Sequence, residues 1–165
     1  MINDWNLYCQ LARVYCQHKM QRLRLVLVIC LGFLCGAICA KDYSVLDYGA
    51  RGDGSTLNTL AIQAAIDDAA NHGGGRVIIP KGRFVSGTIF LKSNVNLHLK
   101  KNAIILGSLS PLNYRRVAKW KALIQANEVC NIAITGSGTI DGRGARLALK
   151  IDSLFYAGEI DSAYY

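Results

Sequence analysis

Five basic and aromatic residues lie close together in the chain: Arg115, Arg116, Lys119, Trp120 and Lys121. Guanidinium and ammonium groups attract anionic groups, and an indole ring offers a flat apolar surface on which a sugar ring can stack. We take Arg115, Arg116 and Trp120 as candidate contacts for an anionic sugar chain. The alternative is an inserted, solvated loop without a ligand, because a run of charged residues is most often an exposed surface.

Other residues with reactive side chains favour structural roles. Asp67 and Asp68 could be paired catalytic carboxylates, but neighbours on a helix point about 100° apart, which places them on a solvated polar face. His98 alternates with two leucines and is expected on the outer face of a strand. Asp53 and Asp141 lie beside glycines, as in structural turns. We therefore assign no catalytic residue, no metal ligand and no cofactor.

The composition is that of a globular protein with a mildly basic surface. Of the 165 residues, 52% are hydrophobic and 18% are charged, which excludes a disordered chain. The formal net charge is +8, and residues 41–165 carry 15 Lys and Arg against 10 Asp and Glu. A net charge of +5 on that part needs no nucleic-acid partner, and none is expected.

Residues 1–40 have the pattern of a secretory leader. Arg22 and Arg24 precede an apolar run, and small residues end at Ala40. We expect residues 20–40 to be a signal peptide cleaved near Ala40. The apolar stretch is shorter than the roughly 20 residues of a membrane span. The expected location is therefore secreted, periplasmic or cell-envelope, without a stable membrane span.

Alternatives remain for this leader. We interpret residues 1–19 as an extension that results from a translation start assigned too far upstream. The alternative is a cytoplasmic extension on a membrane anchor. A lipid-anchored start at Cys35 or Cys39 is less favoured, because bulky residues precede both cysteines. Past the leader, Cys130 remains alone, so residues 41–165 contain no internal disulfide and no cysteine-built metal site.

One helix pattern precedes a long series of strand patterns. Apolar residues at helical spacing predict an amphipathic helix at about residues 56–72, with Ser55 or Thr56 as its N-cap and Gly73–Gly75 after its end. Short β-rich runs follow, separated by Gly, Asn, Lys and Ser: 76–80, 82–85, 88–91, 95–99, 103–106, 122–126, 132–134 and 138–140. Such a series indicates an all-β sandwich, barrel or solenoid.

An internal repeat favours the solenoid. Residues 96–107 align with residues 131–142 at an offset of 35, and both copies share Asn, aliphatic positions, Ile and Gly. Removing the 14-residue polar insertion at 108–121 reduces the offset from 35 to 21 residues. This lies within the ~20–45 residue period of solenoid repeats. The helix at 56–72 would cover the first coil, whose sheet edge and core would otherwise be exposed.

Several motifs point to a family. Asp47–Gly54, Gly73–Gly82, Gly87–Val95 and Gly136–Gly142 occur in order. On these motifs, residues 43–144 resemble the N-terminal part of the polygalacturonases, glycoside hydrolase family 28, in the pectate-lyase-like β-helix superfamily. The resemblance implies a right-handed parallel β-helix, here its N-terminal coils only, capped by one amphipathic α-helix. It also implies a groove for an acidic plant-cell-wall polysaccharide such as pectin or galacturonan.

The catalytic motifs of that family are not found. Its acid and base are aspartates of an Asn-Thr-Asp and an Asp-Asp motif, followed by Gly-His-Gly and Arg-Ile-Lys motifs. None occurs here in that form, since Asp67-Asp68 lies on the expected capping helix. We expect an N-terminal fragment of a secreted pectin-degrading glycosidase, inactive alone, with residues 145–165 a truncated continuation. The alternative is a non-catalytic β-helix module that binds polysaccharide or supports other parts.

Overall fold

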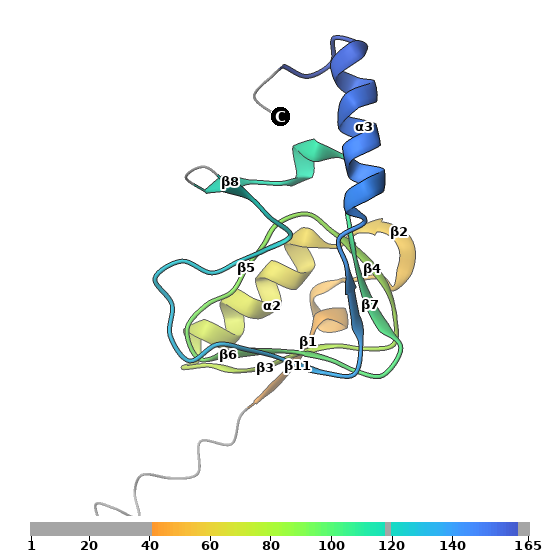
Figure 1. Cartoon of the computed structure of the whole chain (residues 1–165). Helices are drawn as coiled ribbons and strands as arrows, with labels where there is room; N and C mark the ends of the chain where they lie inside the picture. Colours follow the sequence, from red (N-terminus) through yellow and green to blue (C-terminus); the bar gives the residue numbers. More distant parts are fainter. Residues whose placement is uncertain (1–40, 118–119, 162–165) are drawn as a thin grey trace, which may run out of the picture. The chain divides into compact units, whose positions relative to one another are not determined.

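A computed structural model describes residues 41–117 and 120–161, so the expected leader and Lys119 lie outside the described residues. Within these ranges, short parallel strands are wound into successive coils (Figure 1). No helix in the described part of the chain is long and apolar enough to cross a membrane.

The strands of each coil join sheets that run across the coils. Sheet A has the order β1 (Asp42–Ser44), β3 (Gly75–Ile79), β6 (Val95–Leu99) and β11 (Ala133–Gly136). Sheet B has the order β2 (Asp53–Leu57), β4 (Gly82–Ser86), β7 (Ala103–Gly107) and β12 (Thr139–Asp141). Sheet C pairs β5 (Ile89–Phe90) with β10 (Ile124–Gln125). This non-consecutive, parallel order confirms the predicted β-helix.

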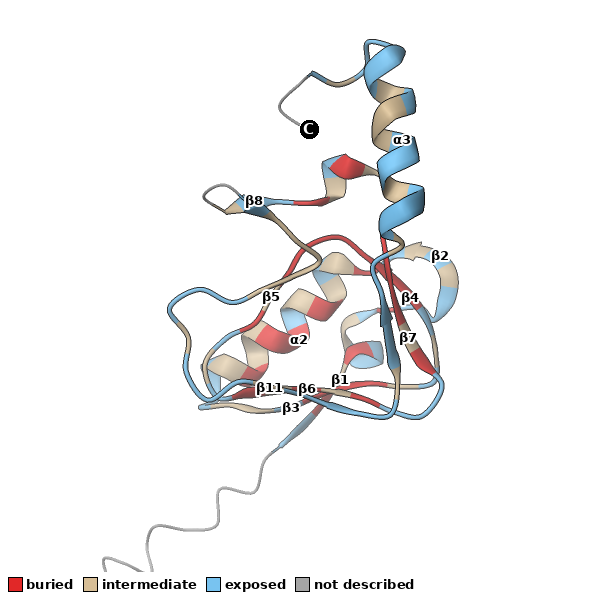
Figure 2. Ribbon diagram, in the orientation of Figure 1, coloured by how far each residue is buried: buried red, intermediate tan, exposed pale blue. Residues whose placement is uncertain are grey.

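The strand register confirms the predicted period. Val77 of β3 lies opposite Leu97 of β6, and Phe84 of β4 lies opposite Ile105 of β7, so each pair is separated by about one predicted repeat. All four side chains are fully buried. Because the register repeats once per coil, inward-facing apolar residues of successive coils lie opposite one another. Figure 2 shows buried residues on neighbouring strands and on α2.

The last described coil differs from the predicted alignment in its first strand. Ile140 lies opposite Ile105 at the predicted offset of 35, but Ile134 lies opposite Leu97 at an offset of 37. The corner between β11 and β12 is two residues shorter than the corner below it, and it is closed by Gly136 and Gly138. A Cβ on either glycine would overlap Leu99. A shift of two residues keeps each side chain on its face of the sheet, so the interior pattern survives.

Helix α2 (Thr59–Asn71) confirms the predicted buried face but not the predicted start. Its residues Ile62, Ala65, Ile66 and Ala69 are fully buried, and the helix packs against β1, β3, β5 and the 3₁₀ helix η1 (Val45–Tyr48). The prediction of Ser55 or Thr56 as N-cap is wrong, because both residues belong to β2. The N-cap is Asn58.

The side chain of Asn58 explains where the helix starts. This buried amide accepts a hydrogen bond from Arg51 N (2.7 Å) and donates to Arg51 O (3.0 Å) and Thr56 O (2.7 Å). Its backbone N–H donates to Val85 O on β4, and its carbonyl accepts from Ile62 N. Asn58 therefore ties the loop, sheet B and the helix start together, and all its polar groups are satisfied.

Gln63 on α2 closes the edge of sheet C. Phe90 N donates to Gln63 Oε1 (2.9 Å), and Gln63 Nε2 donates to Phe90 O (3.1 Å). The side-chain amide thus pairs with the strand as a neighbouring backbone would. Since unpaired strand edges promote association, the helix covers both the core and a polar edge of the first coils.

The opposite end of the stack is more exposed. Ile134 and Ile140 occupy inward positions by register, yet 47% and 40% of their surfaces are exposed. The chain continues into helix α3 (Gly144–Tyr156), which the strand pattern did not predict and in which no residue is fully buried. In Figure 1, α3 extends away from the coils.

Replacing Gln63 with Ala tests the closure of this edge. The substitution leaves the N–H and carbonyl of Phe90 without their partner, and we expect the free energy of unfolding to fall by about 1–3 kcal/mol. Urea denaturation measures it. Asn71→Ala, at an exposed position of the same helix, is the control and should change stability little. Equal stability of Gln63→Ala and the unmodified chain would contradict this role.

Candidate functional site

The polar insertion forms a hairpin beside sheet C. Strand β8 (Arg116–Val117) pairs antiparallel with β9 (Trp120–Lys121), so that Arg116 lies opposite Lys121 and Val117 opposite Trp120. The indole of Trp120 is largely exposed, at 76%. The structure thus places Arg116 and Trp120 on one hairpin, with Arg115 immediately before it.

Thr88 holds both ends of this hairpin. This buried residue precedes β5, and its hydroxyl accepts from Arg115 N (3.0 Å) and donates to Ala122 O (2.8 Å). Its backbone N–H donates to Asn113 O (3.2 Å). A Cβ on the neighbouring Gly87 would overlap Asn113 O. The insertion therefore leaves and rejoins the coil at a fixed point.

The Arg115 side chain lies over sheet C. Its guanidinium carbon is 5.3 Å from the centre of the Phe90 ring, a cation–π arrangement, and Gln125 Nε2 donates to Arg115 O (3.1 Å). Phe90 and Gln125 face each other across β5 and β10. The outer face of sheet C thus presents an aromatic ring with a cation above it.

A second group of contacts orders the start of the insertion. Tyr114 donates its hydroxyl hydrogen to Ser108 O (2.8 Å), while Ser108 Oγ accepts from Asn113 Nδ2 (2.6 Å) and Ser110 N (3.1 Å). Burial raises the pKa of the Tyr114 phenol above its ordinary value. The segment before the hairpin, including the 3₁₀ helix η2 (Pro111–Asn113), is thereby folded upon itself.

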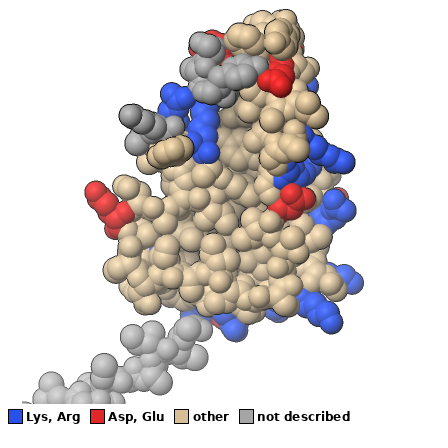
Figure 3. Space-filling model, in the orientation of Figure 1, with Lys and Arg blue, Asp and Glu red and all other residues tan. Residues whose placement is uncertain are grey.

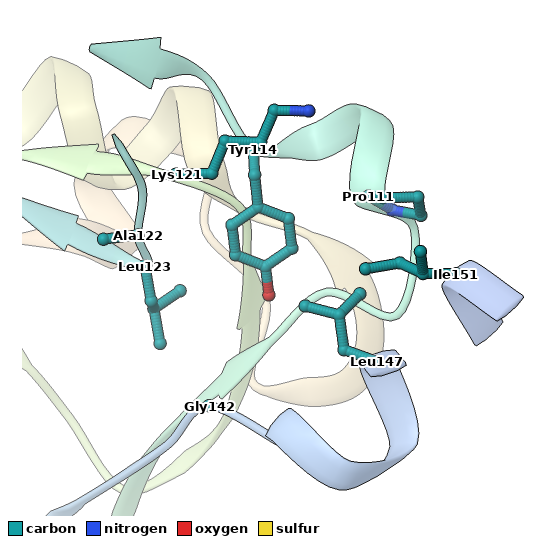
Figure 4. Close-up of a pocket in the computed structure, with 8 residues that line it drawn as sticks. All are labelled: Pro111, Tyr114, Lys121, Ala122, Leu123, Gly142, Leu147 and Ile151. Carbon is teal, nitrogen blue, oxygen red and sulfur yellow. The ribbon is translucent and has the colours of Figure 1, made fainter. Parts of the chain in front are cut away.

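An apolar cavity of about 330 Å³ separates the insertion from α3. Figure 4 shows the Tyr114 ring between Leu123 on one side and Leu147 and Ile151 of α3 on the other. Lys121 also lines the cavity. Burial lowers the pKa of its ammonium group, the charge of Arg116 acts in the same direction, and that of Asp161 opposes it.

The two helical carboxylates have structural partners. Asp68 accepts a hydrogen bond from the Tyr48 hydroxyl at 2.6 Å, and this bond, with burial, raises the pKa of Tyr48 to about 12. Asp67 accepts from Gln63 Nε2 (3.0 Å) and lies 3.5 Å from Lys92 Nζ. Both side chains are partly exposed, at 44% for Asp67 and 38% for Asp68, as expected for a solvated polar face, and both have structural partners there.

Of the other sequence candidates, His98 lies on the predicted outer face, whereas Asp53 begins strand β2 and Asp141 ends strand β12, although both accept the backbone bonds typical of the predicted turns. Asp53 accepts from the backbone N–H groups of Ser55 and Thr56 (both 2.8 Å) and from the Thr56 hydroxyl, which together hold the pKa of its carboxyl well below the usual range. Asp141 accepts from Arg143 N (2.9 Å). His98 is half-buried on the outer face of sheet A, with Nδ1 2.9 Å from the Thr135 hydroxyl.

The sequence analysis missed three parts of this site: Thr88, Phe90 and α3. The alternation in residues 88–91 carries a signal for the first two. It places Ile89 and Leu91 on the face toward the interior of the coils, and Thr88 and Phe90 on the opposite face, where the insertion covers Thr88. No group of three or more His, Cys, Asp or Glu side chains lies close enough to hold a metal ion in the part of the chain that the structure describes.

Comparisons with known proteins find relatives of several kinds, among them polygalacturonases, mannuronan C5-epimerases and a plasmin and fibronectin-binding protein. Residues 43–102 match the family model described as rhamnogalacturonase A/epimerase, pectate lyase-like. The chain is 38% identical over 121 residues to an exo-poly-alpha-D-galacturonosidase of Dickeya chrysanthemi, covering 63% of this chain and 20% of that protein.

Solved structures agree. A family 28 exopolygalacturonase of Yersinia enterocolitica is 41% identical with a TM-score of 0.56, over 62% of this chain and 21% of that one. A hyperthermoactive exopolygalacturonase of Thermotoga maritima is 38% identical with a TM-score of 0.59, over 64% of this chain and 26% of that one. The chain spans between a fifth and about a quarter of the length of these relatives.

Thr88→Val tests how the hairpin is held. Valine keeps the volume but removes the acceptor of Arg115 N and the donor to Ala122 O, so we expect the Arg115 amide hydrogen to exchange at least about tenfold faster. Residue-resolved hydrogen exchange measures this. Thr139→Val, on exposed β12, is the matched control. An unchanged Arg115 exchange rate would show that other contacts hold the hairpin.

Proposed function

We propose that this chain is the N-terminal part of a secreted, polygalacturonase-like glycosidase. Residues 43–102 match the pectate lyase-like family model of rhamnogalacturonase A and epimerase, and the chain is homologous to exopolygalacturonases. In this proposal the hairpin β8–β9 and the outer face of sheet C contact a galacturonan-type polysaccharide such as pectin. The carrying observation is the Arg115 guanidinium held over Phe90, immediately before a hairpin that exposes the indole of Trp120.

The charge of the coils supports an anionic substrate. Residues 69–127 contain ten Lys and Arg and not one Asp or Glu. This segment supplies β3 to β10, including the whole hairpin. An excess of positive charge on a surface raises the local concentration of an anionic polymer. A polyuronide is such a polymer, because it carries a carboxylate on each sugar.

The geometry of the hairpin suits a uronic acid residue. The exposed indole offers an apolar face for one side of a sugar ring, and arginine binds a carboxylate through two parallel N–H···O bonds. Since the base of the hairpin is fixed by Thr88, these groups need little ordering when they bind.

Hydrolysis needs more than this surface. An inverting glycosidase uses one carboxyl group as acid and another as base, roughly 6.5–9.5 Å apart. Residues 69–127 provide neither, and Asp67 and Asp68 are bound to Gln63 and Tyr48. We therefore propose that this chain binds the polysaccharide without cleaving it alone. The same lack of acidic residues favours a second candidate, a non-catalytic polysaccharide-binding module.

Trp120→Ala tests the binding surface. We expect the affinity of the full chain for polygalacturonate to fall about tenfold, because an exposed aromatic contact and its apolar area are lost. Affinity electrophoresis in gels that contain polygalacturonate measures it, with neutral galactan as the reference polymer.

Leu112→Ala is the matched control for this variant. Leu112 is an exposed apolar residue of the same insertion, at 67%, outside the hairpin. Its loss should leave the affinity unchanged. If the unmodified chain were retarded equally by polygalacturonate and galactan, or not at all, the proposed substrate class would be rejected.

The second test concerns activity. We expect the purified chain to release no reducing sugar from polygalacturonate above a blank at any pH between about 4 and 8, since the catalytic aspartate motifs of family 28 do not occur in its sequence. A family 28 exopolygalacturonase in the same assay is the positive control. Reducing-sugar release that tracks the chain through successive purification columns would contradict the proposal.

A further inference from the structure

A second basic surface lies on sheet B, where α3 begins. An open hollow of about 510 Å³ is lined by Arg83 of β4, Leu106 of β7, Asp141 of β12, and Arg143, Gly144, Ala145 and Arg146. Figure 3 shows basic side chains gathered around an acidic one where α3 meets β4 and β7, separate from those near the hairpin. The function proposed above makes no use of this surface.

The charges of the hollow are unbalanced. Three guanidinium groups and one carboxylate line it, for a formal charge of +2. Neither Arg83 nor Arg146 has an ion-pair partner or a side-chain hydrogen bond among the residues that the structure describes. Both side chains are exposed and line the same hollow, so an anion held between them would meet two guanidinium groups that have no competing partner in the described part of the chain.

The neighbouring contacts hold the hollow open. Arg143 Nε donates to Gly107 O at 2.6 Å, which fixes this side chain against the end of β7. Arg143 N donates to the Asp141 carboxylate, so that the carboxylate has a backbone partner. The stem of Arg83 passes over Gly54, where a Cβ would lie 3.4 Å from its own Cβ. The three arginines therefore come from two elements, Arg83 from β4 and the other two from the start of α3.

The backbone at the start of α3 adds to the positive electrostatic potential of the hollow. The first intrahelical bond of α3 runs from Leu147 N to Arg143 O, and no side chain caps the helix start. The N–H groups of Gly144, Ala145 and Arg146 thus have no acceptor within the helix, and these residues line the hollow.

We propose that this hollow is an anion-binding site, separate from the hairpin, for an oxyanion group of the carboxylate or sulfate type. Arg83 and Arg146 bind the anion from opposite elements, and Arg143 orders the floor between them. That the anion is the carboxylate of a uronic acid residue rests on the proposed function; that the hollow takes an oxyanion does not.

The test is a titration of the ¹⁵N-labelled full chain, followed by NMR. Sodium sulfate, D-galacturonate and trigalacturonate are the anionic probes, and galactose is the neutral reference. We expect the anions to shift the amide signals of Gly144, Ala145 and Arg146 saturably, and galactose to leave them in place. Arg83→Gln and Arg146→Gln should each weaken this binding about tenfold, because each removes a charge-assisted hydrogen bond.

Lys101→Gln is the matched control, because it removes one exposed positive charge at the β6–β7 corner outside the hollow. Its titration should match that of the unmodified chain. Anion shifts that are absent at residues 144–146, or equally strong in both arginine variants, would overturn the site.

The probes also separate this proposal from the proposed function. Sulfate binding in the hollow without galacturonate binding would reject the uronate as its ligand. Unchanged galacturonate binding in the hollow of Trp120→Ala, whose affinity for polygalacturonate is lowered, would support two independent sites. If the hairpin does not bind polygalacturonate, the proposed function fails. The anion site is still tested by the shifts of the Gly144, Ala145 and Arg146 amide signals.

Discussion

The alignment of inward-facing aliphatic side chains from one coil to the next is the constraint on which this structure depends. Val77 of β3 lies opposite Leu97 of β6, and Phe84 of β4 lies opposite Ile105 of β7. Both pairs of strands are parallel, and their sequence separations are nearly the same. Such a stack always has a first coil, and here α2 covers it. Four fully buried side chains of the helix fill the interior, and Gln63 pairs with the backbone of Phe90. One helix thus supplies apolar cover and a polar edge together.

The same frame gives the outer surface its function. Because inward positions must be apolar and well packed, chemical variety is confined to outward positions, corners and insertions. The insertion at 108–121 is anchored beside sheet C at Thr88, and its Arg115 guanidinium lies over the Phe90 ring. Arg83 is an outward residue of sheet B, and α3 brings two further arginines to it. The first surface is basic because residues 69–127 lack acidic residues, and the second because three arginines surround one carboxylate.

Much of the fold could be predicted from periodicity. The strands, the length of the repeat and the buried face of α2 all follow from local patterns of apolar residues, which the packing obeys. Details set by distant contacts could not be predicted. The start of α2 depends on the Asn58 amide and its bonds to Arg51 and Thr56, and the two-residue shift of β11 depends on a shorter glycine corner.

The candidate site shows the same division. The composition of residues 115–121 indicated a basic, aromatic cluster, but the position of the Arg115 guanidinium over Phe90 joins two segments that are far apart in the sequence. Helix α3 was missed because residues 145–165 were interpreted as a truncated continuation of the coils. Its residues Leu147 and Ile151 line the cavity opposite Tyr114 instead.

Native-state hydrogen exchange at single residues tests the central claim most directly. If stability arises from stacked coils closed by α2, the amides of β3, β4, β6 and β7 should open only with global unfolding. The amides of β11 and β12, where Ile134 and Ile140 are exposed, should open at clearly lower free energy. Protection in β11 and β12 equal to that in β6 and β7 would contradict this account.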